Sequence, residues 1–236
     1  MQSFRAILCR IGTVVIFIVM LAGCSTINRL NRYSVENSSL RAEMRVPPPP
    51  TLDVDYTMRV DKENILGTVI SVGTTVLKAS EAAKARARME EALSSVDVPG
   101  IILEETSRGF ASTLSARLVE KGQQADYLLD LNIYKYGIEA PSGASAVSLH
   151  LGMNASLYHK VSGKIVWRRK HMTVDIPATP QMFGLEEVLG DIVTVGVLAS
   201  LTVEELEEGF HRLALESAAW VTRTLQKDYY RARYRR

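Results

Sequence analysis

The feature that most restricts the fold of this chain is a long run of strictly alternating side chains in its second half. Residues 146–160 place an apolar residue at every odd position from Val147 to Leu157, and polar residues such as His150 lie between them. Successive side chains of a β-strand point to opposite faces, so this period of two predicts a strand that buries one face.

Three further segments alternate in the same way. Residues 126–138 predict a second long strand, and residues 51–60 predict another near the start of the folded part. Residues 164–176 follow a tight turn at Ser162-Gly163 and are expected to form an antiparallel hairpin with residues 146–160. The apolar phase changes within 164–176, which predicts a β-bulge near residues 168–170.

Three segments have helical character. Residues 62–93 predict a long helix, apolar in its first half and alanine-rich in its second, inserted at about 61–98. Residues 104–121 predict a second helix with apolar side chains on one face. Residues 202–227 predict a C-terminal helix that opens with a capping box of Thr202 and Glu205. The fold class is therefore α+β: a small mixed or antiparallel four-stranded sheet packed by two helices, with an inserted helix and a C-terminal helix.

The N-terminus has the pattern of an export signal. Residues 1–10 carry two arginines and no acid, and an uncharged run of eleven residues follows at 11–21, too short to span a bilayer comfortably. Leu21-Ala22-Gly23-Cys24 then resembles the lipobox of bacterial lipoproteins. That resemblance implies cleavage after Gly23 and attachment of diacylglycerol and a further acyl chain, such as palmitate, to Cys24. Residues 1–23 are thus a predicted signal peptide.

Removal of this signal has two consequences. The chain has 2 cysteines, of which Cys9 leaves with the signal and Cys24 is lipidated, so no disulfide is expected. The signal carries no acid and only two of the 28 basic residues, so the mature chain has as many basic as acidic residues. A chain without net positive charge gives no indication of nucleic-acid binding.

The mature chain divides into three parts. Residues 24–50 are polar, end in four prolines and predict a lipidated tether. Residues 51–227 form the single α+β domain. Residues 228–236 form a basic tail with interleaved tyrosines, suited to anionic lipid headgroups, peptidoglycan carboxylates or an acidic partner, unless it is simply a solvated helix end. Under the sorting rule known for enterobacteria, Ser25 indicates the outer membrane, with the domain facing the periplasm.

The core motifs resemble those of a known group of envelope proteins. Ala125-Asp126-Tyr127 begins a strand, and residues 160–167, KVSGKIVW, form a hairpin. Both are similar to motifs of the TolB N-terminal domain, the LpoB lipoproteins and the CsgG-type secretion lipoproteins. The resemblance implies a non-enzymatic envelope lipoprotein that binds another protein, and it transfers no catalytic residue.

Two glycine-containing apolar segments nearly repeat each other. Residues 65–73 match residues 188–196, with Gly67 and Gly73 at the positions of Gly190 and Gly196. Glycine lowers helix propensity by about 1 kcal/mol, so these residues need a reason such as close helix packing. The segments either pack on each other within the domain or form an apolar surface for self-association, a partner or the lipid interface.

No motif of catalysis or cofactor binding is recognised. The sequence lacks a P-loop, a dinucleotide-binding glycine pattern, G-x-S-x-G and H-E-x-x-H, and its 4 histidines lie at no ligand spacing. We therefore predict no catalytic, cofactor or metal residue. The expected function is a non-catalytic adaptor or assembly factor of an envelope machine, anchored by lipid and bound to an envelope protein. The alternative is an oligomeric secretion or pore-associated lipoprotein.

Overall fold

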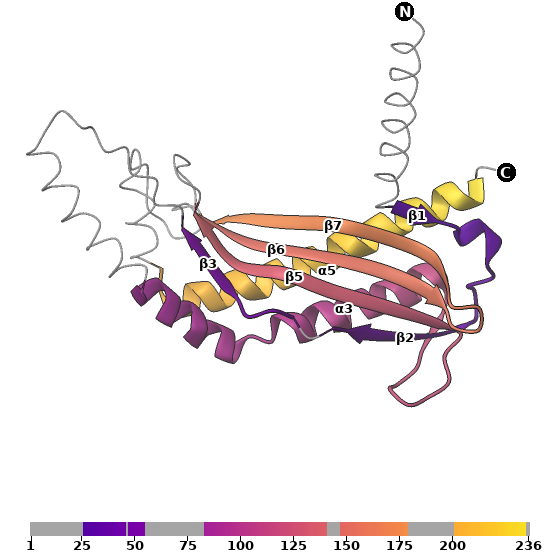
Figure 1. The fold of residues 1–236 in the computed structure, drawn as a ribbon, viewed down its shortest axis with the longest axis horizontal. Helices are drawn as coiled ribbons and strands as arrows, with labels where there is room; N and C mark the ends of the chain where they lie inside the picture. Colours follow the sequence, from indigo (N-terminus) through magenta and orange to yellow (C-terminus); the bar gives the residue numbers. More distant parts are fainter. Residues whose placement is uncertain (1–25, 46, 55–82, 141–146, 179–200, 235–236) are drawn as a thin grey trace, which may run out of the picture.

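The computed structural model describes residues 26–45, 47–54, 83–140, 147–178 and 201–234. They form a mixed sheet of seven strands with helices packed on one face (Figure 1). In chain order the elements are β1 (Thr26–Asn28), the 3₁₀-helix η1 (Leu30–Arg32), β2 (Ser39–Met44), β3 (Thr51–Val54), a helix over 83–95, α3 (Val98–Leu114), β4 (Arg117–Leu118), β5 (Tyr127–Ala140), β6 (Val147–His159), β7 (Lys164–Ala178) and α5 (Val203–Tyr234). Among these residues no helix is both long and apolar enough to cross a membrane.

The α+β class is confirmed, but the prediction of four strands is wrong. The sheet order is β1-β7-β6-β5-β2-β4, and β3 also pairs with β5. The three long alternating segments form the antiparallel meander β5-β6-β7, as expected from their period of two. β2 and β3 both run parallel to β5, β2 beside Tyr127–Leu131 and β3 beside Gly137–Ala140.

The predicted bulge lies close to the expected place. Met153 faces Met172 and Ala155 faces Arg169, so β7 holds one extra residue between them. His171 within this bulge adopts a positive φ of 53°. The extra residue restores a buried position to Met172, which explains the change of apolar phase.

The prediction of a tether over 24–50 is wrong for its described part. Residues 26–28 and 39–44 are strands of the sheet, and Arg45 continues the pairing by donating its N–H to the carbonyl of Leu131 at 3.0 Å. Leu40 is fully buried, and Ala42 and Met44 are partly buried against the core. The alternation of Leu40, Ala42 and Met44 is the signal that could have identified β2. It is weak, because the strand is only six residues long and one of these three residues is a small alanine.

Two helix boundaries also differ from prediction. The second helix begins at Val98 rather than 104, because Asp97 caps it by accepting from the N–H of Gly100, and Pro99 fits the first turn. It ends at Leu114 rather than 121, since Ser115 takes a left-handed conformation and the chain turns into β4. The long helix predicted over 62–93 is described only from residue 83, and there it is helical and continues to residue 95.

α5 follows the predicted start but not the predicted end. Its capping box is present: the Thr202 N–H donates to Glu205 Oε2 at 2.8 Å, and the Glu205 N–H donates to Thr202 Oγ1 at 3.2 Å. The helix continues to Tyr234, so most of the predicted tail 228–236 is helical. Trp220 of this helix is exposed.

The core lies between the sheet and the two long helices, which run in the same direction across it (Figure 1). Phe110 of α3 and Trp167 of β7 are both fully buried and meet edge to face, with ring centroids 5.4 Å apart. Aromatic pairs in this geometry stabilise a core beyond the burial of their surface. This contact fixes α3 against β7 at the end of the sheet that carries β1.

Candidate functional site at the β1–α5 corner

The chain that follows the predicted lipidated cysteine is held on the edge of the sheet from Thr26 onward. β1 pairs antiparallel with β7, with Thr26 opposite Arg169 and Asn28 opposite Trp167. The backbone N–H of Arg29 extends this pairing by donating to the carbonyl of Val166 at 2.8 Å. A residue adds at most about 3.6 Å of chain, so the Cα of Cys24 lies within about 7 Å of the Cα of Thr26.

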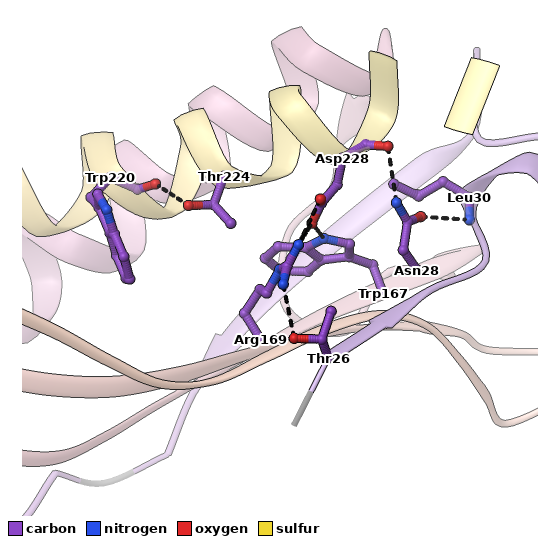
Figure 2. A network of polar contacts seen from close by, with 8 residues as sticks. All are labelled: Thr26, Asn28, Leu30, Trp167, Arg169, Trp220, Thr224 and Asp228. Atoms are coloured by element: carbon purple, nitrogen blue, oxygen red, sulfur yellow. Dashed lines mark hydrogen bonds and ion pairs between the residues drawn. The ribbon is translucent and has the colours of Figure 1, made fainter. Parts of the chain in front are cut away.

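A buried carboxylate joins this edge to the end of α5 (Figure 2). Asp228 is 3% exposed, and the Arg169 guanidinium donates to both its oxygens, from Nη2 at 2.6 and 2.5 Å and from Nε to Oδ2 at 2.9 Å. The indole Nε1–H of Trp167 donates to the same Oδ2 at 2.8 Å. A buried charge is tolerated when it is paired and hydrogen-bonded, and Asp228 meets both conditions.

The same network reaches β1 by two further contacts (Figure 2). Arg169 Nη1 donates to Thr26 Oγ1 at 2.8 Å, and Asn28 Nδ2 donates to the backbone carbonyl of Asp228 at 3.0 Å. Three segments far apart in sequence therefore share one polar centre. Sequence reasoning missed this centre because it placed Asp228 in a tail. The available signal was a single acid three residues after Leu225, on the apolar face of the C-terminal helix.

A second group of contacts joins the last turns of α5 to the segment after η1. The Tyr229 hydroxyl donates to Glu36 Oε1 at 2.9 Å, and Arg233 forms an ion pair with Glu36. The Arg233 guanidinium also lies 4.9 Å from the centre of the Tyr229 ring. Burial, and to a lesser degree the neighbouring Tyr230, raises the pKa of the Tyr229 phenol, which is therefore protonated at neutral pH. A hollow of about 530 Å³ between η1 and α5 borders these residues.

The surface of this corner is basic and aromatic. Lys227, Tyr230, Arg231 and Tyr234 follow the i, i+3, i+4, i+7 spacing of one helix face and are all exposed, Tyr234 to 83%. Arg29, which precedes η1, and Arg32, which ends it, are exposed as well. Among the described residues, Arg29, Arg32, Lys227 and Arg231 form no ion pair. We call these four residues and the two tyrosines the basic corner.

The motif Ala125-Asp126-Tyr127 begins β5, as predicted. Asp126 Oδ2 accepts from the hydroxyl of Ser39 at 2.7 Å and from its backbone N–H at 2.8 Å. These two bonds hold the pKa of the Asp126 carboxyl below its usual value, and the bond from the hydroxyl has the larger effect. The motif thus has a structural role, which is to fix the start of β2 against the start of β5.

A cluster of charged side chains lies at the other end of the sheet. His150 Nδ1 is 2.7 Å from Asp175 Oδ1 and 3.4 Å from Glu139 Oε2, and the three residues come from adjacent strands. Sequence reasoning saw no ligand spacing for His150, because a sheet brings such groups together across strands. These atoms are of the types that bind a divalent ion. Lys135 Nζ pairs with the same Glu139 at 3.2 Å, so that carboxylate already has a cationic partner.

The residues singled out from the sequence fall largely outside the described part of the chain. The lipobox residues Leu21, Ala22, Gly23 and Cys24 and the paired glycines Gly67, Gly73, Gly190 and Gly196 all lie outside it. The described helices have a close contact at a different glycine. A Cβ added at Gly109 of α3 would lie 2.4 Å from Thr222 Oγ1 of α5. In the sequence, the available signal for this close helix contact was a glycine within a helical pattern.

Comparison with known proteins yields similarities of structure only. No protein-family model matches the sequence, and no curated protein matches it. A protein of Xanthomonas campestris assigned to the family DUF330 is 15% identical, with a TM-score of 0.37 over 83% of this chain and 89% of its own. A protein of Caulobacter crescentus described as a lipoprotein is 17% identical, with a TM-score of 0.32 over 59% of this chain and 93% of its own.

A third solved structure is the PelC dodecamer from Paraburkholderia phytofirmans. It is 12% identical, with a TM-score of 0.26 over 77% of this chain and 92% of its own. Similarities at these values assign the chain to no family.

Proposed function

We propose that this protein is a lipid-anchored protein of the bacterial cell envelope, attached through Cys24 and acting as a non-catalytic adaptor or assembly factor. The observation that carries the proposal is the position of the lipobox, Leu21 to Cys24, two residues before a strand that is locked onto the folded domain. An acylated Cys24 would hold the domain directly at a membrane surface. Ser25 favours the outer membrane, with the domain in the periplasm.

The anchor is tested by changing the acylated residue. Cys24→Ala should abolish both palmitate labelling and recovery in the membrane fraction, because one of the 2 cysteines remains and it lies in the signal. Cys9→Ala is the matched control and should leave both unchanged. Stable attachment requires more than one acyl chain, so partial labelling should already reduce membrane recovery. Unchanged labelling of Cys24→Ala would contradict the anchor.

An adaptor needs a surface for its partner, and the sheet face opposite α3 and α5 supports one. Tyr134 on this face is 39% exposed and lies against Gly152 of the next strand, where an added Cβ would be 2.6 Å from its ring. Half-exposed polar residues of β5 and β6, among them Asp130 and Asn154, lie on the same face. Reversible protein interfaces are about as polar as the rest of a surface and are enriched in tyrosine.

The adaptor role is tested in intact cells with a photoreactive residue at Tyr134. The matched control is Leu215 on the outer side of α5, which is 40% exposed. We expect one discrete adduct from position 134 and none from position 215. Light scattering of the purified protein should show a monomer or small oligomer. A detergent-stable ring would instead favour an oligomeric secretion or pore-associated lipoprotein.

A further inference from the structure

We propose that the basic corner rests on the membrane and binds the headgroups of anionic phospholipids. The inference deepens the proposed function, since it uses the acylation of Cys24 to position the bilayer. Only Ser25 separates Cys24 from Thr26, so the backbone of the acylated residue is held within about 7 Å of the start of β1. The part of the domain nearest the bilayer is therefore the part that holds β1.

The polar centre around Asp228 determines which side chains share this position. Thr26 and Asn28 are bonded through Arg169 and the Asp228 carbonyl to the last turns of α5. The end of α5 thus cannot move away from β1 without breaking a buried ion pair. Figure 1 shows the C-terminal turns of α5 beside β1 and η1. The basic corner is consequently fixed next to the anchor.

The composition of the corner matches an anionic headgroup layer. Its four arginine and lysine side chains have no carboxylate partner among the described residues, whereas Arg169 and Arg233 nearby are paired with Asp228 and Glu36. Lysine and arginine close to an anionic leaflet each favour binding by about fivefold. Tyr230 and Tyr234 are 57% and 83% exposed, and tyrosine has the apolar ring and polar tip that suit the interface.

The orientation is measured on the acylated protein reconstituted in vesicles. A single cysteine is introduced as Tyr234→Cys or, for the control, as Glu208→Cys, and is labelled with a fluorophore after Cys24 has been acylated. The two positions lie about 39 Å apart along α5, and both are exposed. Headgroup-spin-labelled lipid in vesicles with anionic phosphatidylglycerol should quench the label at 234 strongly and the label at 208 weakly. Equal quenching, or stronger quenching at 208, would overturn the orientation.

The role of charge is measured with paired variants in the same assay. Arg29→Gln with Arg231→Gln should lower the ratio of docked to undocked protein by about 25-fold in anionic vesicles. The control pair, Arg108→Gln with Arg212→Gln, removes two arginines that are also exposed but pair with glutamates of their own helices. It should change this ratio by less than about twofold. Vesicles of phosphatidylcholine alone should abolish the difference.

The outcomes separate this inference from the proposed function. Failure of the protein to float with vesicles, together with an unmodified Cys24 by mass spectrometry, would refute the anchor. A second result would be flotation with acylated Cys24 but equal quenching of the label at 234 in the test pair and the control pair. That result would refute the basic corner while leaving the anchor intact. Binding to purified peptidoglycan that is lost in the Arg29 and Arg231 variants, without quenching by lipid, would assign the corner to that polymer and overturn the lipid assignment.

Discussion

Replacement of Asp228 by alanine should destabilise the protein through the loss of a buried charge. Breaking a buried ion pair by removing one partner typically costs about 3–5 kcal/mol. The Arg169 side chain is 25% exposed and can recover part of its hydration, which places the ion-pair loss at the low end of this range. The Trp167 indole N–H is fully buried and cannot reach water, which adds to the cost. We therefore expect Asp228→Ala to lower the free energy of unfolding by about 3 kcal/mol.

Two variants define what the loss means. Asp228→Asn keeps the volume and one acceptor, so it should cost less, about 1–2 kcal/mol. The double variant Asp228→Asn with Arg169→Met removes the charge of both partners and should be more stable than the sum of the single changes predicts. The matched control is Asp175→Ala, since Asp175 has a 53% exposed side chain and its loss should cost less than about 1 kcal/mol.

The assay is urea denaturation at neutral pH, combined with amide hydrogen exchange of β1. The Asp228→Ala protein should exchange the β1 amides faster than wild type, because Arg169 no longer positions its bond to Thr26. A cost equal to that of Asp175→Ala would refute the reasoning, and so would unchanged exchange in β1. Either result would mean that the buried pair does not hold β1 to α5.

Three further predictions concern other contacts. Gly109→Ala should lower the free energy of unfolding by about 1–2 kcal/mol, since the added Cβ meets Thr222 and overpacking exceeds the gain in helix propensity; Thr222→Ala in the same chain should restore it. Ser39→Ala should cost stability at pH 7, because it removes a hydrogen bond that lowers the pKa of the Asp126 carboxyl. That stabilisation is complete only at a pH above the carboxyl's unfolded pKa and is lost as the carboxyl becomes protonated, so part of the cost should vanish below about pH 4. A pH series of melts that runs parallel to wild type would contradict this. Thr202→Ala should cost about 1 kcal/mol in urea by removing the cap of α5, while Thr202→Ser should stay near wild type.

The sequence alone determined the elements whose side chains carry their own periodicity. The strands β5, β6 and β7 each alternate over many residues, so one face had to be buried wherever they paired, and the phase change in β7 located the bulge. The start of α5 was determined by Thr202 and Glu205, because a capping box is a local structure that satisfies its own backbone groups. These are short-range effects and need no knowledge of the rest of the chain.

The tertiary structure alone decided where the first strands and the last helical turns belong. β1 is three residues long and β2 six, too short for their pattern to outweigh a polar composition, and both are strands because β7 and β5 supply the partner backbone groups. Asp228 is buried because Arg169 and Trp167, about sixty residues earlier, neutralise and hydrogen-bond it, whereas the sequence around it is basic and polar. A side chain's local neighbours set its propensity, but burial of a charge depends on groups that only the fold brings within bonding distance.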